Sequence, residues 1–288
     1  MFREAESPSG SIGLGEKENG EDEQVSDGRT RQIRRRSSLV TGGGSGIGAA
    51  VVAQLVDEGA ARVYVVDIVV DELRRRYGDD PKTIVRVVDV SDPAAVDAAM
   101  AEVVAAEGRL DVVVHAAGVD DPESKKIITE ATAAGTPIDL TANLTDARWR
   151  RVMSVNLDGT FHVVRSAVRE MKPKGGAIVV IGSSSAFDTL TGYPHYAASK
   201  AAVHAFCQAV AKEVVAFGIR LNLVAPGPTE TGMSARTPEE LKMQWVNNTP
   251  VPYATPDEIA DNVLFLASEQ ARNVVGAVLL SNRGRFTV

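Results

Sequence analysis

The chain has 288 residues, of which 44% are hydrophobic, so it is long enough to bury the core of one large α/β domain or of two small ones. Its formal net charge of -7 argues against a nucleic acid or an anionic membrane surface as a partner. Since no apolar run is long enough to span a bilayer and the N-terminus lacks the apolar core of a signal peptide, we expect a cytoplasmic protein without a membrane partner.

The first 36 residues differ in composition from the rest of the chain. Acidic residues cluster between Glu16 and Asp27, arginines follow up to Arg36, and Gly and Ser occur throughout. Such a segment carries too little apolar surface to offset the entropy lost on ordering. We therefore predict that residues 1–36 are a disordered extension and that residues 37–288 form the folded domain. The arginines leave open a second interpretation, in which they bind a partner.

A glycine-rich turn follows the first strand, which begins near Leu39. The turn reads Thr41-Gly42-Gly43-Gly44-Ser45-Gly46-Ile47-Gly48, and a helical pattern continues from it. Glycines let the backbone approach a pyrophosphate, which then rests on the amides and positive dipole of the helix N-terminus. The order of strand, turn and helix therefore predicts a dinucleotide site rather than an ordinary glycine loop.

The second strand, residues 62–66, ends at Asp67, about 20 residues beyond the glycines, where an acidic residue binds the adenine-ribose hydroxyls. A 2′-phosphate there would set about two negative charges against the carboxylate. The turn offers Ser45 and residues 68–70 are apolar, so no cation offsets this repulsion. We expect NAD(H) to be preferred to NADP(H), although the arginines at 74–76 could swing inward. The alternative is that Asp67 is an ordinary strand-end residue.

Strands and helices then alternate. We expect strands at residues 83–88, 110–114, 176–181, 219–224 and 277–280, and helices at about 91–107, 145–171 (interrupted near Asn156 and Gly159), 195–217 and 256–266. Residues 119–144 are predicted to be a surface insertion with one short helix, and residues 237–248 a mobile helical flap. Repeated β-α units predict a doubly wound parallel sheet in one Rossmann-like, three-layer α/β/α domain, whose ligands bind at the carboxyl ends of the strands.

A tyrosine and a lysine four residues apart, Tyr196 and Lys200, share one face of the predicted 195–217 helix. A free tyrosine has a pKa near 10, and an ammonium beside it favours the phenolate, lowering that pKa toward the working range of an acid/base catalyst. Ser183 ends the preceding strand, and its hydroxyl can hold a carbonyl or alcohol oxygen beside the phenol. Alone, the pair is a weak signal, because a solvated lysine beside a packed tyrosine is the more common reason for this spacing.

Together, these motifs resemble those of the short-chain dehydrogenase/reductase family over residues 39–284. In chain order they are Thr41-Gly42-x-x-x-Gly46-x-Gly48, Asp67, Asp89-Val90, Asn156, Ser183, Tyr196-x-x-x-Lys200 and Pro226-Gly227-x-x-x-Thr231. The resemblance implies that Tyr196 is the general acid/base, that Lys200 lowers its pKa and holds the nicotinamide ribose, and that Ser183 positions the substrate oxygen.

The same resemblance assigns the remaining site residues. Asn156 would hold a water that links Lys200 to solvent, and the backbone of Thr229 would meet the nicotinamide carboxamide. The expected cofactor-binding residues are Gly42, Ser45, Gly46, Ile47, Gly48, Asp67, Asp89, Val90, His115, Tyr196, Lys200 and Thr229. No metal is expected, because the histidines have no ligand partners at useful spacing.

Three features depart from the family pattern. His115 stands where the family has the asparagine of Asn-Ala-Gly, and we expect it to be a structural substitute rather than a catalytic group. Asn282-Arg283-Gly284 replaces Asp-Gly-Gly, which alters a subunit contact. The insertion after Gly118 is longer than usual and lies where it could border the pocket or another subunit.

These expectations converge on an NAD-dependent enzyme that interconverts a secondary alcohol and a ketone by hydride transfer. Reduction of a 3-oxoacyl thioester, carried on acyl-carrier protein or CoA, is the alternative within the family. A non-catalytic cofactor-binding sensor or scaffold is the alternative from another class, against which all four catalytic residues argue. We expect a homotetramer, or failing that a homodimer, in which the helices at 145–171 and 195–217 pack against their symmetry mates.

Overall fold

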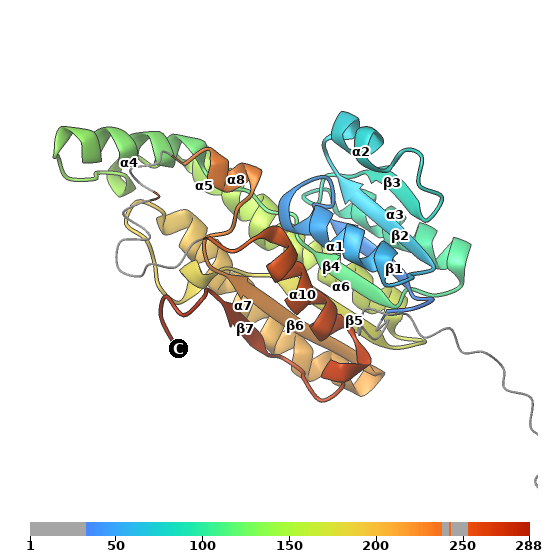
Figure 1. Cartoon of the computed structure of the whole chain (residues 1–288). Helices are drawn as coiled ribbons and strands as arrows, with labels where there is room; N and C mark the ends of the chain where they lie inside the picture. Colours follow the sequence, from blue (N-terminus) through green and yellow to red (C-terminus); the bar gives the residue numbers. More distant parts are fainter. Residues whose placement is uncertain (1–32, 238–241, 243–252) are drawn as a thin grey trace, which may run out of the picture. The chain divides into compact units, whose positions relative to one another are not determined.

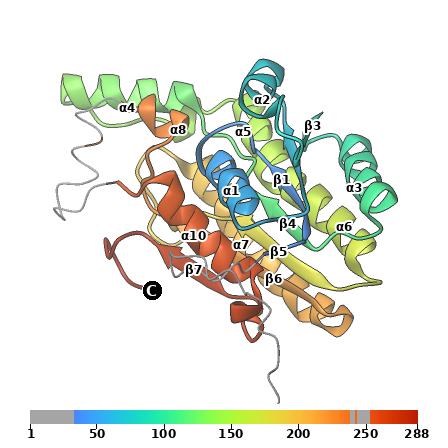
Figure 2. The same ribbon diagram turned by 45° about the vertical axis from the view of Figure 1, so that its right-hand side comes forward.

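Seven parallel strands form the sheet at the centre of the protein, in the order β3-β2-β1-β4-β5-β6-β7 (Figures 1 and 2). The computed structural model describes residues 33–237, 242 and 253–288. The strands are β1 (Ser37–Thr41), β2 (Arg62–Asp67), β3 (Thr83–Val87), β4 (Val112–His115), β5 (Gly176–Ile181), β6 (Ile219–Pro226) and β7 (Val278–Ser281). The predicted doubly wound parallel sheet is confirmed.

Helices cover both faces of this sheet, which is why its inner strands are continuous apolar runs rather than alternating ones. The helices are α1 (Gly46–Asp57), α2 (Val70–Tyr77), α3 (Pro93–Glu107), α4 (Pro122–Ala134), α5 (Asp146–Met153), α6 (Gly159–Met171), α7 (Pro194–Val214), α8 (Gly232–Ala235) and α10 (Pro256–Ala267), with short turns η1 (Thr141–Asn143), η2 (Ser154–Asp158), η3 (Ser184–Ala186), η4 (Val215–Phe217) and η5 (Glu269–Ala271). One apolar cluster packs α1, α2 and α10 on the sheet, and a second packs α3, α6 and α7 on its other face.

The predicted 145–171 helix is interrupted where the sequence analysis places the break. A π-helical turn, η2, separates α5 from α6 and contains Asn156, which is buried. Gly159 begins α6 against Val90, and a Cβ at Gly159 would lie only 2.8 Å from the Val90 side chain. The wider turn and the close packing together fix the direction in which Asn156 enters the interior.

The folded part begins earlier than predicted. Ile33 is fully buried in the apolar cluster beneath α1 and α10, and the Arg35 amide donates to the Gly59 carbonyl over 2.9 Å. The Arg36 guanidinium also donates to the Ala267 carbonyl over 3.2 Å, at the end of α10. Residues 33–36 therefore belong to the folded unit, whereas residues 1–32 and most of the predicted 237–248 flap lie outside the described residues.

The 119–144 insertion is less superficial than expected. It contains α4, a 13-residue helix with Ser124, Lys125 and Ile128 buried, followed by η1. In both ribbon views α4 lies beside α8 at the carboxyl-end side of the sheet (Figures 1 and 2). The insertion therefore packs against the segment that follows β6.

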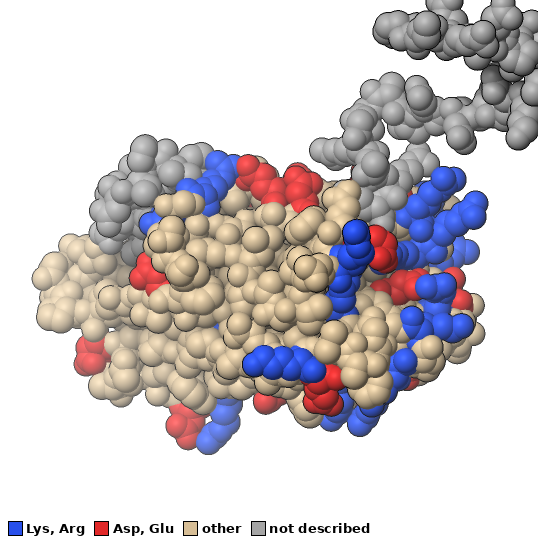
Figure 3. All heavy atoms as spheres, turned by 90° about the horizontal axis from the view of Figure 1, so that it is seen from below, with Lys and Arg blue, Asp and Glu red and all other residues tan. Residues whose placement is uncertain are grey.

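On the face shown in Figure 3, acidic side chains lie among the basic ones instead of leaving a uniform basic stripe of the kind that binds nucleic acid. Among the helices that the structure describes, none combines the length and apolar character needed to cross a membrane.

Candidate active site

The parallel register brings the predicted site residues to one edge of the sheet. Thr41 at the end of β1 pairs with His115 at the end of β4, which in turn pairs with Val180 near the end of β5. Because all strands point the same way, the loops that follow them open on the same side. The glycine turn and Ser183 lie in these loops, and Tyr196 and Lys200 lie in the first turns of α7.

Ser183 directly follows β5 and Gly182 and is held in an extended conformation. Its hydroxyl accepts a hydrogen bond from the Ser185 amide over 3.1 Å, and its own amide donates to Nε2 of His204 over 3.2 Å. Gly182 makes the second contact possible, because a Cβ there would lie 2.2 Å from the same His204 nitrogen. His204 on α7 therefore fixes the position of the Ser183 backbone.

The Ser183 hydroxyl lies close enough to the Tyr196 phenol to influence its pKa. Burial raises the pKa of the Tyr196 phenol; the hydrogen bond from Ser183 lowers it, and the negative charge of Asp120 raises it further. The direction is opposite to the lowering expected from Lys200, because losing water around the phenol outweighs the hydrogen bond. The protein's own groups thus favour the protonated phenol.

Lys200 is 6% exposed, and its ammonium donates to the Ile181 carbonyl over 3.0 Å. Its Nζ lies 6.0 Å from the centre of the Tyr196 ring, so the two side chains share one site as the four-residue spacing predicts. Burial lowers the pKa of Lys200 to about 8. Gly118 lies against this ammonium, since a Cβ there would be 3.6 Å from Nζ.

Asn156 binds the backbone of the segment that follows β4. Its Oδ1 accepts from the Val119 amide over 2.8 Å, and its Nδ2 donates to the Val119 carbonyl over 3.0 Å and to the Ser199 hydroxyl over 3.1 Å. These bonds use both amide hydrogens, so the side chain holds protein atoms. The expected water link between Asn156 and Lys200 stays a prediction.

The glycine turn fits a pyrophosphate group. Gly42 has φ +67°, and a Cβ there would lie 2.6 Å from the Ala117 amide nitrogen. Ser45 is exposed at the N-cap of α1, and its side chain makes no capping bond. The amides of Gly46 and Ile47 start the helix and have no partner within it, which leaves a cradle of donors at a positive helix end.

Asp67 lies beside this turn at the end of β2. One oxygen of its carboxylate accepts from the Gly44 amide over 2.9 Å, and the other accepts from the Ile68 amide over 2.7 Å. Among the described residues no ion pair joins a lysine or arginine to Asp67, so its charge remains available to a ribose hydroxyl.

The other expected cofactor residues surround the same edge. Asp89 is exposed after β3, and its carboxylate accepts from the Ser91 amide over 2.9 Å. Val90 is buried, and its carbonyl accepts from Nδ1 of His162 over 3.0 Å. Thr229 is buried after β6, where its hydroxyl donates to the Gly227 carbonyl over 3.0 Å.

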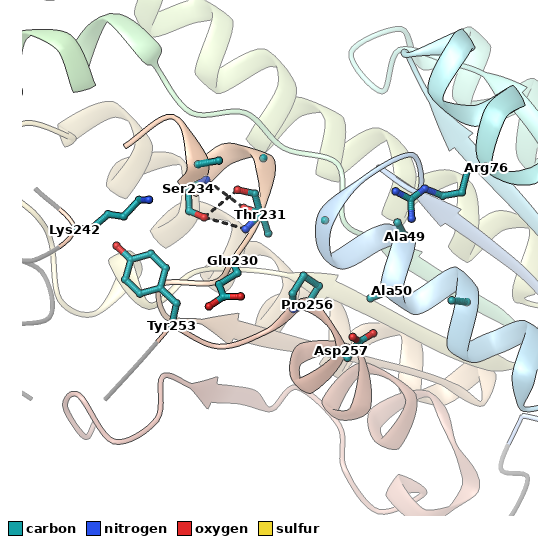
Figure 4. A pocket seen from close by; sticks show the side chains of 14 residues that line it. Ala49, Ala50, Arg76, Glu230, Thr231, Ser234, Lys242, Tyr253, Pro256 and Asp257 are labelled. Atoms are coloured by element: carbon teal, nitrogen blue, oxygen red, sulfur yellow. Dashed lines mark hydrogen bonds between the residues drawn. The ribbon is translucent and has the colours of Figure 1, made fainter. Parts of the chain in front are cut away.

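A pocket of about 840 Å³ adjoins the start of α1 (Figure 4). It is lined by Gly46, Ala49, Ala50, Ala53, Arg76, Glu230, Thr231, Gly232, Ser234, Ala235, Lys242, Tyr253, Pro256 and Asp257. Gly46 and Thr231 place it between the glycine turn and α8. Arg76 also reaches it, although its guanidinium is paired with Glu72 at 3.3 Å.

The chain is similar in sequence and in fold to known proteins. A family model described as enoyl-(acyl carrier protein) reductase matches residues 42–285. The 3-oxoacyl-[acyl-carrier-protein] reductase of Chlamydia muridarum is 33% identical over 86% of this chain and 96% of its own, and galactitol 2-dehydrogenase of Rhizobium johnstonii is 36% identical over 86% and 93%. A solved short-chain type dehydrogenase/reductase from Mycobacterium ulcerans superposes with a TM-score of 0.78 at 31% identity, over 88% of this chain and 90% of that one.

The chain is a short-chain dehydrogenase/reductase. The resemblance inferred from the motifs is therefore confirmed, and with it the assignment as an oxidoreductase of CH–OH groups that uses a nicotinamide cofactor.

In this short-chain dehydrogenase/reductase, His115 replaces the asparagine whose side chain would bond to the central sheet. The histidine makes such a bond itself, from the end of β4 to the end of β1. Nδ1 of His115 lies 2.7 Å from the Thr41 hydroxyl, which also accepts from the Ala117 amide over 3.3 Å. The ring is 1% exposed, and burial, followed by the charge of Lys200, lowers its pKa to about 3. A neutral, enclosed imidazole supports its interpretation as a structural substitute.

Asn282-Arg283-Gly284, which replaces the Asp-Gly-Gly of the family pattern, forms a closed turn. Oδ1 of Asn282 accepts from the Gly284 amide over 3.0 Å, and its Nδ2 donates to the Phe286 carbonyl over 2.9 Å. Arg283 has φ +53° and pairs with Glu258 on α10. Within the described residues these contacts hold the turn on its own subunit.

Sequence reasoning missed two contributors to the site. His204 was considered only as a metal ligand, although its spacing of four residues from Lys200 places it on the same face of α7 as Tyr196. The adjacent carboxylates Asp120 and Asp121 are both buried, but they fall in the stretch where no periodicity indicated burial.

We predict that the stability of the folded protein falls as the pH drops from about 6.5. Burial, followed by the charge of Lys200, lowers the pKa of His204 to about 4. Between that value and the ordinary 6.5 the unfolded chain binds a proton at His204 that the folded chain excludes, so the contribution of His204 to stability is complete above 6.5 and declines by roughly 1.4 kcal/mol per pH unit down to about 4. Thermal unfolding of the His204→Gln variant, whose amide oxygen can still accept from Ser183, should depend less on pH over this window. An unchanged slope would contradict the assignment.

Proposed function

We propose that this protein interconverts a secondary alcohol and a ketone with NAD(H), and that Tyr196 is the general acid/base. The observation that carries the proposal is the convergence of Ser183, Tyr196 and the buried Lys200 at the edge of the sheet where ligands bind: Lys200 Nζ lies 6.0 Å from the centre of the Tyr196 ring and donates to the Ile181 carbonyl, two residues before Ser183. The bound cofactor supplies or accepts the hydride, and the chain supplies orientation and proton transfer.

The proton moves at the oxygen of Tyr196. In reduction the phenol donates its proton to the forming alkoxide, and the Ser183 hydroxyl holds that oxygen in place. In oxidation the Tyr196 phenolate takes the proton of the substrate hydroxyl. Because burial raises the pKa of Tyr196, the oxidation requires a higher pH than the reduction.

The relatives support two substrate classes. Galactitol 2-dehydrogenase favours a polyol or another small secondary alcohol, whereas the 3-oxoacyl-[acyl-carrier-protein] reductase favours a 3-oxoacyl thioester, which is our second candidate. A panel should include galactitol, cyclic alcohols, simple ketones and acetoacetyl-CoA, with both cofactors, and follow the absorbance of the reduced nicotinamide. Cofactor binding without turnover of any compound would instead favour a non-catalytic sensor or scaffold.

We place the enzyme in the cytoplasm, where a free nicotinamide pool is available, and assign catalysis to residues 37–288. Asn156 completes the catalytic set by fixing Val119 and Ser199 next to Lys200. The turn of Gly42, Ser45, Gly46, Ile47 and Gly48 would hold the cofactor's pyrophosphate, together with the residues that follow β3, β4 and β6.

We predict that Tyr196→Phe lowers turnover at least about 100-fold, the usual scale of a lost general acid/base, while cofactor affinity stays nearly constant. The ring remains to pack on its neighbours, and only the proton-transferring oxygen is removed. Cofactor titration by fluorescence and steady-state kinetics separate the two effects, and Lys200→Ala should weaken both. Near-normal turnover of Tyr196→Phe would refute the mechanism.

We predict that the wild type prefers NAD(H) to NADP(H) by roughly a hundredfold in kcat/KM and that Asp67→Ser removes most of this ratio. The Asp67 carboxylate repels a 2′-phosphate by a few kcal/mol, since like charges would meet at a partly buried position. Asp71→Ser, which removes an exposed carboxylate from the first turn of α2, is the matched control. A wild type that favours NADP(H), or an Asp67→Ser variant with an unchanged ratio, would show that Asp67 is only a strand-end residue.

We predict a homotetramer, or failing that a homodimer, formed through α5, α6 and α7. Phe161 on α6 is 41% exposed, and Ala201 and Ala205 present small exposed side chains along α7. Light scattering at micromolar concentration should give a multiple of the subunit mass, which Ala205→Glu reduces and Ala101→Glu on the exposed face of α3 does not. A monomeric wild type would rule the assembly out.

A further inference from the structure

Two adjacent carboxylates are buried where the chain leaves the catalytic centre. Asp120 and Asp121 expose only 7% and 6% of their side chains. They follow Gly118, which lies against the Lys200 ammonium, and Val119, which Asn156 holds through two hydrogen bonds. The backbone path therefore carries both carboxylates to the border of the proposed site.

Asp120 joins α4 to the segment around α8. Its carboxylate contacts the Lys125 ammonium at 2.6 Å and the Arg236 guanidinium at 2.9 Å. Lys125 is itself 6% exposed and also donates to the Met233 carbonyl in α8 over 2.6 Å. An ion pair this deeply buried loses much hydration, so removing one partner leaves an uncompensated charge.

Asp121 has equal burial but different partners. Its carboxylate accepts from Arg148 on α5, from the Ser124 hydroxyl over 2.8 Å and, at 3.1 Å, pairs with Nε2 of His195. These contacts tie α4 to α5 and α7 below the surface. Asp121 thus holds the insertion in place without reaching α8.

The charge of Asp120 also acts on the catalytic phenol. After burial, the negative charge of Asp120 is a further cause that raises the pKa of Tyr196. The charged groups that surround Asp120 are Lys125 on α4, Arg151 on α5, whose guanidinium lies 3.4 Å from the Asp120 carbonyl, and Arg236 after α8. The extent to which the negative charge of Asp120 is neutralised therefore depends on contacts that also position α8.

We propose that Asp120, Lys125 and Arg236 form a latch that holds α8 against the insertion, and that Asp120 is a positioning residue which sets the protonation of Tyr196 through its charge. This inference rests on the proposed role of Tyr196. The latch couples the position of α8 to proton transfer, because Asp120 is neutralised by Arg236, which follows α8, and by Lys125, which also binds the Met233 carbonyl of α8.

The test compares pH profiles of kcat for alcohol oxidation in the full-length chain. The substrate is galactitol or, if galactitol is not oxidised, the alcohol of the panel with the highest kcat/KM. In Asp120→Asn the midpoint of the rise in kcat should move to lower pH, because the loss of the negative charge and the release of two cations both favour the phenolate. In Lys125→Met and in Arg236→Gln the midpoint should move to higher pH, because Asp120 is then less neutralised. The KM of Lys125→Met should also rise about tenfold as α8 loosens.

Asp121→Asn is the matched control, since it removes a neighbouring, equally buried carboxylate. Its midpoint should equal that of the wild type, whatever its thermal stability. An unshifted Asp120→Asn profile, equal shifts in Asp120→Asn and Asp121→Asn, or shifts of one sign in Asp120→Asn and Lys125→Met would overturn the proposal. If Asp120→Asn does not fold, Arg236→Gln decides the question, because Arg236 is the exposed member of the latch. An unshifted midpoint in the pH profile of Arg236→Gln would then overturn the proposal. Failure of the proposed function is separate, because Tyr196→Phe would then retain turnover.

Discussion

The buried ammonium of Lys200 is the constraint on which the rest of the site depends. It is almost fully enclosed and, in the structure, donates to the Ile181 carbonyl rather than to a carboxylate. Burial, followed by the charge of this enclosed cation, lowers the pKa of both His115 and His204. The two histidines are therefore neutral at physiological pH. Neutrality suits their contacts, because a neutral ring nitrogen of His204 can accept from the Ser183 amide, whereas a protonated one cannot.

Small residues make this arrangement possible. Gly182 lets His204 approach the strand end, and Gly118 lets the chain pass Lys200 and Asn156. Any side chain at Gly182 would displace the imidazole and with it the Ser183 backbone. The geometry of the candidate site therefore depends as much on positions without a Cβ as on the groups that carry chemistry.

The sequence predicts the fold and the position of the four proposed catalytic residues, because both depend on local patterns. Continuous apolar runs indicate buried parallel strands, and the spacing of Tyr196 and Lys200 indicates one helix face. Prediction from the sequence fails where the burial of a residue depends on partners that are distant in the chain. Asp120 pairs with Arg236, which is 116 residues away, so a charged stretch without periodicity was interpreted as surface. The burial of Ile33 was not predicted for a similar reason, since a single apolar residue among arginines gives no sign that α1 and α10 will cover it.

The charges around Tyr196 bias the proposed chemistry toward one protonation state. Burial and the carboxylate of Asp120 both raise the pKa of the phenol, while burial lowers the pKa of Lys200 to about 8, so the enclosure favours the neutral form of each partner. A neutral phenol is the form that donates a proton to an alkoxide, and it is the wrong form for taking a proton from an alcohol. At neutral pH the protein's own groups therefore support reduction directly, whereas oxidation requires the phenol to lose its proton first. Contacts that neutralise Asp120 weaken this bias, which gives the insertion and α8 an influence on the chemistry without touching the reacting atoms.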